Sequence, residues 1–223
     1  MDAWDILVRR TSSYCELHCP LLFTQSTFTE ADRLAHEVYQ PNSPVLKELA
    51  DEFGSRLIQD DGSLNRGALG KVVFGNPDAL RRLEHIVWPH VQELVQSRIQ
   101  QLKDSFISEN SSKRPIIIVE AAVLLDAGWN DFQDGVWVVK VDPDVALARL
   151  KEHRNMAHDD ALQRIEAQKS RRGLGNLQEE IDKGIVSAVV DNSGNVEDLK
   201  RALDEKLKDE SAWYPSKPVV ESD

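Results

Sequence analysis

Glu120 directly follows residues 116–119, an unbroken run of β-branched side chains. Such a run predicts a strand buried on both faces, which is typical of a central strand in a parallel sheet. Parallel α/β sheets bind their ligands at the carboxyl ends of the strands. We therefore expect the Glu120 carboxylate at a ligand-binding edge. The alternative is that Glu120 is an acid at the start of a following helix, where the helix dipole favours it.

Asp32 is a second candidate carboxylate, and it lies in a helix predicted for residues 29–39. Thr29 has the residue type of an N-cap, and Asp32 follows it at the spacing of a capping box. Capping alone would therefore account for this acid. A carboxylate in such a position could instead orient a hydroxyl group and accept its proton.

Cationic side chains cluster in the second half of the chain, between residues 154 and 172; they are Arg154, Arg164, Lys169, Arg171 and Arg172. Arginine forks bind phosphate groups and neutralise charge that develops during group transfer. The competing interpretation is a solvated helix face with ion pairs between successive turns.

Two polar segments read as turns from their residue types. In the first, Ser63 and Asn65 would form a turn that leaves Arg66 on the surface. In the second, residues 191–194 (Asp-Asn-Ser-Gly, with Asn192 inside) follow a predicted strand and precede a predicted helix. A simple connecting turn would use the same residues.

Strands and helices alternate in the second half of the chain, and these elements must position the polar side chains. We predict strands at 116–119, 136–141 and 185–190 and helices at 145–153, 159–168 and 196–207. Further helices are predicted at 29–39, 45–53, 65–74 and 77–103. This alternation is typical of βαβ units, so the fold class is α/β with a parallel sheet flanked by helices.

The composition excludes several classes of protein. The 223 residues carry a net charge of −11, which argues against broad nucleic-acid binding. There is no apolar run of about 18 residues, so no membrane span is expected. Cys15 and Cys19 fit a reducing compartment, so we expect the cytoplasm. The basic and hydroxyl residues at 9–13 make a mitochondrial presequence the alternative, whereas Asp2 and Asp5 oppose it.

Several segments, taken in order, resemble the dephospho-CoA kinase family. Members of this family are P-loop kinases that place a phosphate on the ribose 3′-hydroxyl of dephospho-CoA. The matching segments include 30–35 (Glu-Ala-Asp-Arg-Leu-Ala), 61–70 (Asp-Gly-Ser-Leu-Asn-Arg-Gly-Ala-Leu-Gly), 120–129 (Glu-Ala-Ala-Val-Leu-Leu-Asp-Ala-Gly-Trp), 164–168 (Arg-Ile-Glu-Ala-Gln) and 190–194 (Val-Asp-Asn-Ser-Gly). The resemblance extends from about residue 27 to 207. Residues 121–129 look like the eukaryotic kinases, including the kinase part of bifunctional CoA synthase.

The resemblance implies a role for each candidate residue. Asp32 matches the catalytic carboxylate, and Glu120 matches an acid that holds Mg²⁺ with ATP, directly or through water. The remaining positions match groups that bind the substrates: Arg154 and Arg164 in the lid and Asn192 against adenine for ATP, and Asn65 and Arg66 for the acceptor.

The resemblance also implies a domain organisation. Residues 27–207 would form the kinase-like domain, with a helical acceptor-binding insertion at 45–105 and a lid at 150–184. Residues 1–26 would be an atypical N-terminal segment, and residues 208–223 a disordered tail. The family begins with a strand and a Gly-rich phosphate loop, but this chain has no glycine before Gly54. The first strand and the phosphate loop are therefore expected to be missing or replaced.

The resulting hypothesis is a dephospho-CoA kinase that uses Mg²⁺ with ATP. The alternatives are a catalytically inactive relative that binds CoA-like ligands or a partner, and another nucleoside or nucleotide kinase. Neither membrane nor nucleic acid is expected as a partner. The sequence predicts no particular oligomeric state.

Overall fold

The computed structural model describes residues 26–108, 116–154, 156–168 and 175–209. These residues divide into two compact units. We call the part within Pro20–Ala121 the N-terminal unit and the part within Ala122–Asp223 the C-terminal unit. Each unit is described by itself.

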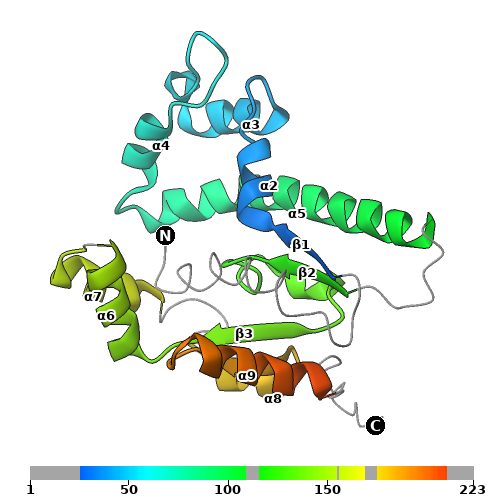
Figure 1. Ribbon diagram of the computed structural model, residues 1–223. Helices are drawn as coiled ribbons and strands as arrows, with labels where there is room; N and C mark the ends of the chain where they lie inside the picture. The colour runs from blue at the N-terminus through cyan, green and yellow to red at the C-terminus, as the bar shows by residue number, and fades with distance from the viewer. Residues whose placement is uncertain (1–25, 109–115, 155, 169–174, 210–223) are drawn as a thin grey trace, which may run out of the picture. The chain divides into compact units, whose positions relative to one another are not determined.

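The N-terminal unit contains two strands and a set of helices (Figure 1). Its elements are β1 (Ser26–Glu30), α2 (Ala31–Glu37), α3 (Pro44–Phe53), η1 (Ser55–Leu57), α4 (Arg66–Val73), α5 (Pro77–Ser108) and β2 (Ile116–Glu120). The long helix α5 contacts α2, α3, α4 and both strands. Helix α5 is therefore the element against which the rest of this unit packs.

Helix α3 shows how local sequence and packing combine in the N-terminal unit. Pro44 occupies its first turn, where the missing N–H costs nothing, and Gly54 ends it with φ of +98°. Its apolar positions Val45, Leu46 and Leu49 are each at most 2% exposed. Their spacing is that of one helix face, which packs against α5.

Strands β1 and β2 pair in parallel, in register from Ser26 opposite Ile116 to Glu30 opposite Glu120. Both strands therefore end at the same edge. The chain enters α2 immediately after β1, and α2 contacts β2 as well as α5.

The C-terminal unit is also built around a pair of parallel strands. Its elements are η2 (Trp129–Phe132), β3 (Val136–Lys140), α6 (Pro143–Arg154), α7 (His158–Gln168), α8 (Leu177–Asp182), β4 (Val186–Asp191) and α9 (Val196–Lys208). Helices α8 and α9 contact β4. Helices α6 and α7 pack together through Ala146, Leu150 and Ala161.

The predicted parallel strands and most helices are confirmed, with three corrections. The predicted helix at 29–39 begins two residues late, because residues 26–30 pair with β2 as strand β1. Helix α8 was not predicted. The described strands form two separate two-stranded sheets, one in each unit. Residues 1–25 and 210–223, where an atypical segment and a tail were predicted, lie outside the described residues.

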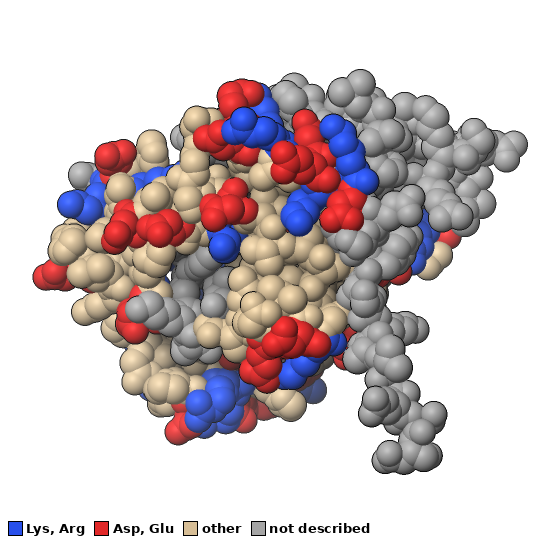
Figure 2. Space-filling view, turned by 90° about the horizontal axis from the view of Figure 1, so that it is seen from below, with Lys and Arg blue, Asp and Glu red and all other residues tan. Residues whose placement is uncertain are grey.

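Charge is mixed on the face shown in Figure 2. Lys and Arg side chains alternate there with Asp and Glu, and the described residues visible on that face form no continuous basic patch. None of the described helices combines the length and the apolarity needed to cross a membrane.

Candidate active site

The carboxyl ends of β1 and β2 bring acidic residues together, as the sequence predicted for Glu120. Glu30 and Glu120 are the last residues of their strands and lie opposite each other in the parallel ladder. Both are half-buried. Asp32 is the second residue of α2, which starts where β1 ends. The backbone thus places three acidic positions at one edge of the sheet.

The structure contradicts a helix start at Thr29 and a helix directly after Glu120, on which the structural alternatives for Asp32 and Glu120 relied. Thr29 is not an N-cap: it lies in β1, pairs with Val119 and is 6% exposed. Strand pairing with β2 overrides the local capping signal, and the N-cap position falls on Glu30. Similarly, no helix starts directly after Glu120, because residues 122–128 form turns. The side chain of Asp32 lies outside what the structure describes.

Asn65 has a clear structural role at the start of α4. Its side-chain oxygen accepts a hydrogen bond from the Ala68 backbone N–H at 2.9 Å, which makes Asn65 the N-cap. The preceding turn is closed by Asp61, whose Oδ1 accepts from the Ser63 backbone N–H at 2.9 Å. Hydrogen bonds from the Ser63 hydroxyl and backbone hold the pKa of Asp61 below its usual range.

Arg66 is exposed and reaches the helix that carries Asp32. One of its terminal nitrogens lies 3.3 Å from His36 Nδ1, and its guanidinium carbon lies 5.5 Å from the centre of the Tyr39 ring. Burial raises the pKa of the Tyr39 hydroxyl, and the nearby Arg66 charge opposes that rise. Positions 32 and 36 are one turn apart on α2. The acceptor-binding candidate and the catalytic candidate are therefore brought to the same helix.

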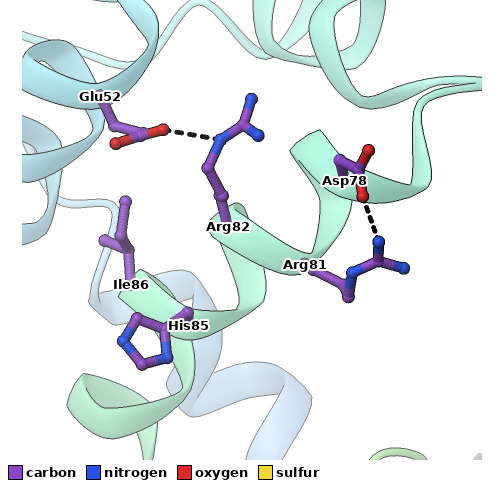
Figure 3. A pocket seen from close by; sticks show the side chains of 6 residues that line it. All are labelled: Glu52, Asp78, Arg81, Arg82, His85 and Ile86. Carbon is purple, nitrogen blue, oxygen red and sulfur yellow. Dashed lines mark hydrogen bonds and ion pairs between the residues drawn. The ribbon is translucent and has the colours of Figure 1, made fainter.

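A pocket of about 560 Å³ lies at the start of α5. It is lined by Glu52, Asp78, Arg81, Arg82, His85 and Ile86 (Figure 3). Arg82 Nε lies 2.7 Å from Glu52 Oε1, and Arg81 is paired with Asp78. Because each guanidinium already faces a carboxylate, this pocket is a poor cradle for phosphate. None of the predicted site residues lines it.

Arg154 and Arg164 lie on the two packed helices of the C-terminal unit. Arg154 ends α6, and Arg164 is in the middle of α7. Both side chains are half-buried, unlike those of a fully solvated helix face. The other predicted cations, Lys169, Arg171 and Arg172, lie outside the described residues.

Asn192 sits in the turn that follows β4, and it is 8% exposed. Its backbone N–H donates to the Lys140 carbonyl at 2.8 Å, across the β3–β4 pair. Among the described residues, its side-chain amide makes no hydrogen bond. That amide can both donate and accept, which suits the edge of a nucleobase.

Arg149 is the residue of this region that sequence reasoning missed. It donates hydrogen bonds to the backbone carbonyls of Asn192 and Gly194, each at 2.8 Å. These partners are 43 and 45 residues away in the chain. No periodicity or local motif signals a contact over that separation.

Comparison with known proteins identifies the family to which this chain is similar. The family model for dephospho-CoA kinase matches residues 11–198. A dephospho-CoA kinase from Geobacter metallireducens is 35% identical over 178 residues, covering 80% of this chain and 81% of that protein. The enzyme from Geobacter sulfurreducens is 32% identical and covers 79% of this chain and 82% of that protein.

Two solved structures share the fold. TT1252 from Thermus thermophilus superposes with a TM-score of 0.59 at 20% identity, over 92% of each chain. The dephospho-CoA kinase from Campylobacter jejuni superposes with a TM-score of 0.53 at 18% identity, over 92% of this chain and 90% of that chain. With the family match over most of its length and relatives above 30% identity, this chain belongs to the dephospho-CoA kinase family.

Proposed function

We propose that this chain transfers the γ-phosphate of ATP to the 3′-hydroxyl of dephospho-CoA and so makes CoA. The family match over residues 11–198 carries the proposal. The acidic edge of the N-terminal unit supports it, because this is where an α/β kinase would work. The relatives named above are bacterial, so they do not support the eukaryotic type that residues 121–129 suggested. They favour the cytoplasm over the mitochondrion.

In this proposal Asp32 orients the attacking hydroxyl and accepts its proton. Phosphoryl transfer demands mainly positioning and charge stabilisation, so a fixed base at the acceptor is the key contribution of the N-terminal unit. The start of α2 is a suitable place, since it directly follows β1, whose pairing with β2 places it at the sheet edge. Asn65 shapes the α4 start, and Arg66 supplies a positive charge for the acceptor.

Mg²⁺ suits the donor set at that edge. The described residues contain no group of three or more His, Cys, Asp or Glu that could form a complete metal cage. Mg²⁺ is usually held by one or two carboxylates together with substrate phosphates and water, which matches Glu120 at the end of β2. When bound with ATP, the ion neutralises charge on the β- and γ-phosphates.

The C-terminal unit would hold ATP. Arg154 and Arg164 supply guanidinium groups for the phosphates, and Asn192 lies in the turn assigned to adenine. Closure of such a lid over ATP would exclude water from the reaction.

A second candidate function is an inactive relative that binds CoA-like ligands or a partner. A phosphate loop requires glycine where the backbone wraps the phosphate, and residues 1–53 contain none, so the affinity for ATP is the property to measure. Calorimetric titration with Mg-ATP and with dephospho-CoA separates the two functions. A chain that binds dephospho-CoA but does not bind Mg-ATP would support the inactive relative.

The decisive test is a coupled assay for ADP, with CoA identified by mass spectrometry. We expect turnover by the wild-type chain and a loss of about 10²–10⁴-fold in kcat for Asp32→Asn, because the general base is removed. Asp51→Asn is the matched control, since Asp51 is exposed on α3. Absence of ADP formation by the wild-type chain would overturn the kinase function, and full activity of Asp32→Asn would overturn the assigned base.

A further inference from the structure

The turn at residues 191–194 is held by more hydrogen bonds than a simple connection needs. The Asp142 backbone N–H donates to the Ser193 hydroxyl oxygen at 2.8 Å, and the Ser193 N–H donates to Asp191 Oδ1 at 2.7 Å. The Asn192 N–H is bound to the Lys140 carbonyl. These bonds tie the turn to the β3 end and to itself.

Arg149 adds a tether from a different element. It projects from α6, and two nitrogens of its planar guanidinium donate separately to the carbonyls of Asn192 and Gly194 at 2.8 Å. A planar, charged guanidinium that holds two acceptors restricts both the position and the orientation of the backbone that carries those acceptors. The two carbonyls flank Ser193, so the contact restrains the backbone of the turn from Asn192 to Gly194.

The carbonyls of Asn192 and Gly194 already accept hydrogen bonds from Arg149. The Asn192 amide makes no hydrogen bond among the described residues, so it is a polar group of the turn that can contact a base. Arg154 lies five residues after Arg149 on the same helix, which is about 7.5 Å along the axis. Helix α6 therefore connects the turn to a cation assigned to the phosphates.

We infer that Arg149 is a positioning residue that holds the 191–194 turn in the form that receives the adenine base of ATP. The inference rests on the proposed function. Arg149 does not touch the nucleotide; it acts through the backbone of Asn192 and Gly194. Its loss should weaken recognition of the base and leave recognition of the phosphates unchanged.

The test compares a ligand with a base to one without. Titration calorimetry on the full chain measures Kd for Mg-ATP and for Mg-tripolyphosphate in the wild type, Arg149→Met and Arg149→Lys. Arg149→Lys keeps the charge and the alkyl stem but cannot bridge two carbonyls with a planar fork. Arg98→Met is the control, because Arg98 is an exposed arginine of α5 whose guanidinium contacts Gln101.

We expect Arg149→Met to raise Kd for Mg-ATP about tenfold, the effect of losing about one hydrogen bond from a charged donor. Arg149→Lys should lie between it and the wild type, and Kd for tripolyphosphate should stay constant throughout. An unchanged Mg-ATP affinity in either folded variant, or an equal weakening of the affinity for both ligands, would overturn this inference but leave the proposed function standing. If thermal unfolding shows that Arg149→Met is not folded, Arg149→Lys decides. A wild-type chain that binds neither ligand overturns the proposed function and the inference together.

Discussion

Asn65 and Arg66 are neighbours in the chain, yet they serve different parts of the N-terminal unit. Asn65 points back into its own helix and satisfies the Ala68 N–H, a contact worth about 1 kcal/mol at a helix N-cap. Arg66 points away, toward His36 of α2 and toward Tyr39, which lies just beyond the end of that helix. A change at Asn65 therefore tests folding, whereas a change at Arg66 tests the proposed contact with the acceptor.

Asp191 makes the stability of the C-terminal unit dependent on pH. Hydrogen bonds from the Ser193 hydroxyl and backbone N–H hold the pKa of the Asp191 carboxyl below its usual range. A carboxyl whose pKa is lower in the folded chain stabilises the fold above its unfolded pKa, which is about 3.9. That contribution is lost as pH falls from there through the lower folded value. The side chain is 56% exposed, so the effect is small.

We expect Asp191→Asn to lower the urea midpoint of unfolding at pH 7, because the amide cannot provide the charged acceptor. The difference from the wild type should shrink as pH falls below about 4. Asp204→Asn, at an exposed position of α9, is the control and should shift stability by less than about 0.5 kcal/mol. A difference that stays constant from pH 7 to pH 3 would contradict this explanation.

At the scale of elements, strand pairing decides where the acidic positions lie. The capping spacing of Thr29 and Asp32 predicted a helix start, but β1 takes Thr29 into the ladder with β2. The same pairing puts Glu30 opposite Glu120. Two chain segments far apart in sequence thus create the sheet edge that neither could form alone.

The turn before α4 depends on Gly62, which has φ of +78°. A Cβ at this position would lie 2.6 Å from Asn42 Oδ1, and the Gly62 carbonyl accepts from the Asn42 N–H at 3.2 Å. We expect Gly62→Ala to reduce the free energy of unfolding by about 1–2 kcal/mol, chiefly from the left-handed backbone. Chemical denaturation measures this.

Gly70→Ala is the matched control for that change. Gly70 lies inside α4, and an added Cβ would meet no atom within 4 Å. Alanine there should leave stability equal or raise it by about 0.5–1 kcal/mol, because glycine is the poorer helix former. Equal effects of the two substitutions would show that the backbone angle of Gly62 is not the cause.

At the scale of the whole molecule, there are two units, each with its own pair of parallel strands. The residues to which the proposed reaction assigns roles are divided between these units. The acidic edge and Arg66 are in the N-terminal unit, and Arg149, Arg154, Arg164 and Asn192 are in the C-terminal unit. A ligand that binds only the folded chain raises its stability by mass action.

We expect Mg-ATP at 100 times its Kd to stabilise the folded chain by about 2.7 kcal/mol. For a chain of this size that corresponds to a rise in Tm of about 5–10 °C. Differential scanning fluorimetry with Mg²⁺ alone at matched ionic strength provides the control. An unchanged Tm at millimolar Mg-ATP would favour the inactive relative over the kinase.

The sequence alone determined the class of elements and the residues with candidate chemistry. The strand at 116–119 and the helix at 45–53 each depend on neighbours in the chain, so local patterns were sufficient to predict them. The ordered motifs likewise indicated the family, which the match of the family model to residues 11–198 confirms. The predicted roles of the site residues remain predictions.

Only the tertiary structure decided which distant residues meet. It placed Glu30 opposite Glu120, turned Thr29 from a cap into a strand residue, and joined Arg149 to the turn at Asn192. Strand pairing and guanidinium–carbonyl contacts form between segments separated by tens of residues. The free energy of these contacts depends on how the two segments are aligned in space. That alignment produces no periodic pattern in the sequence of either segment.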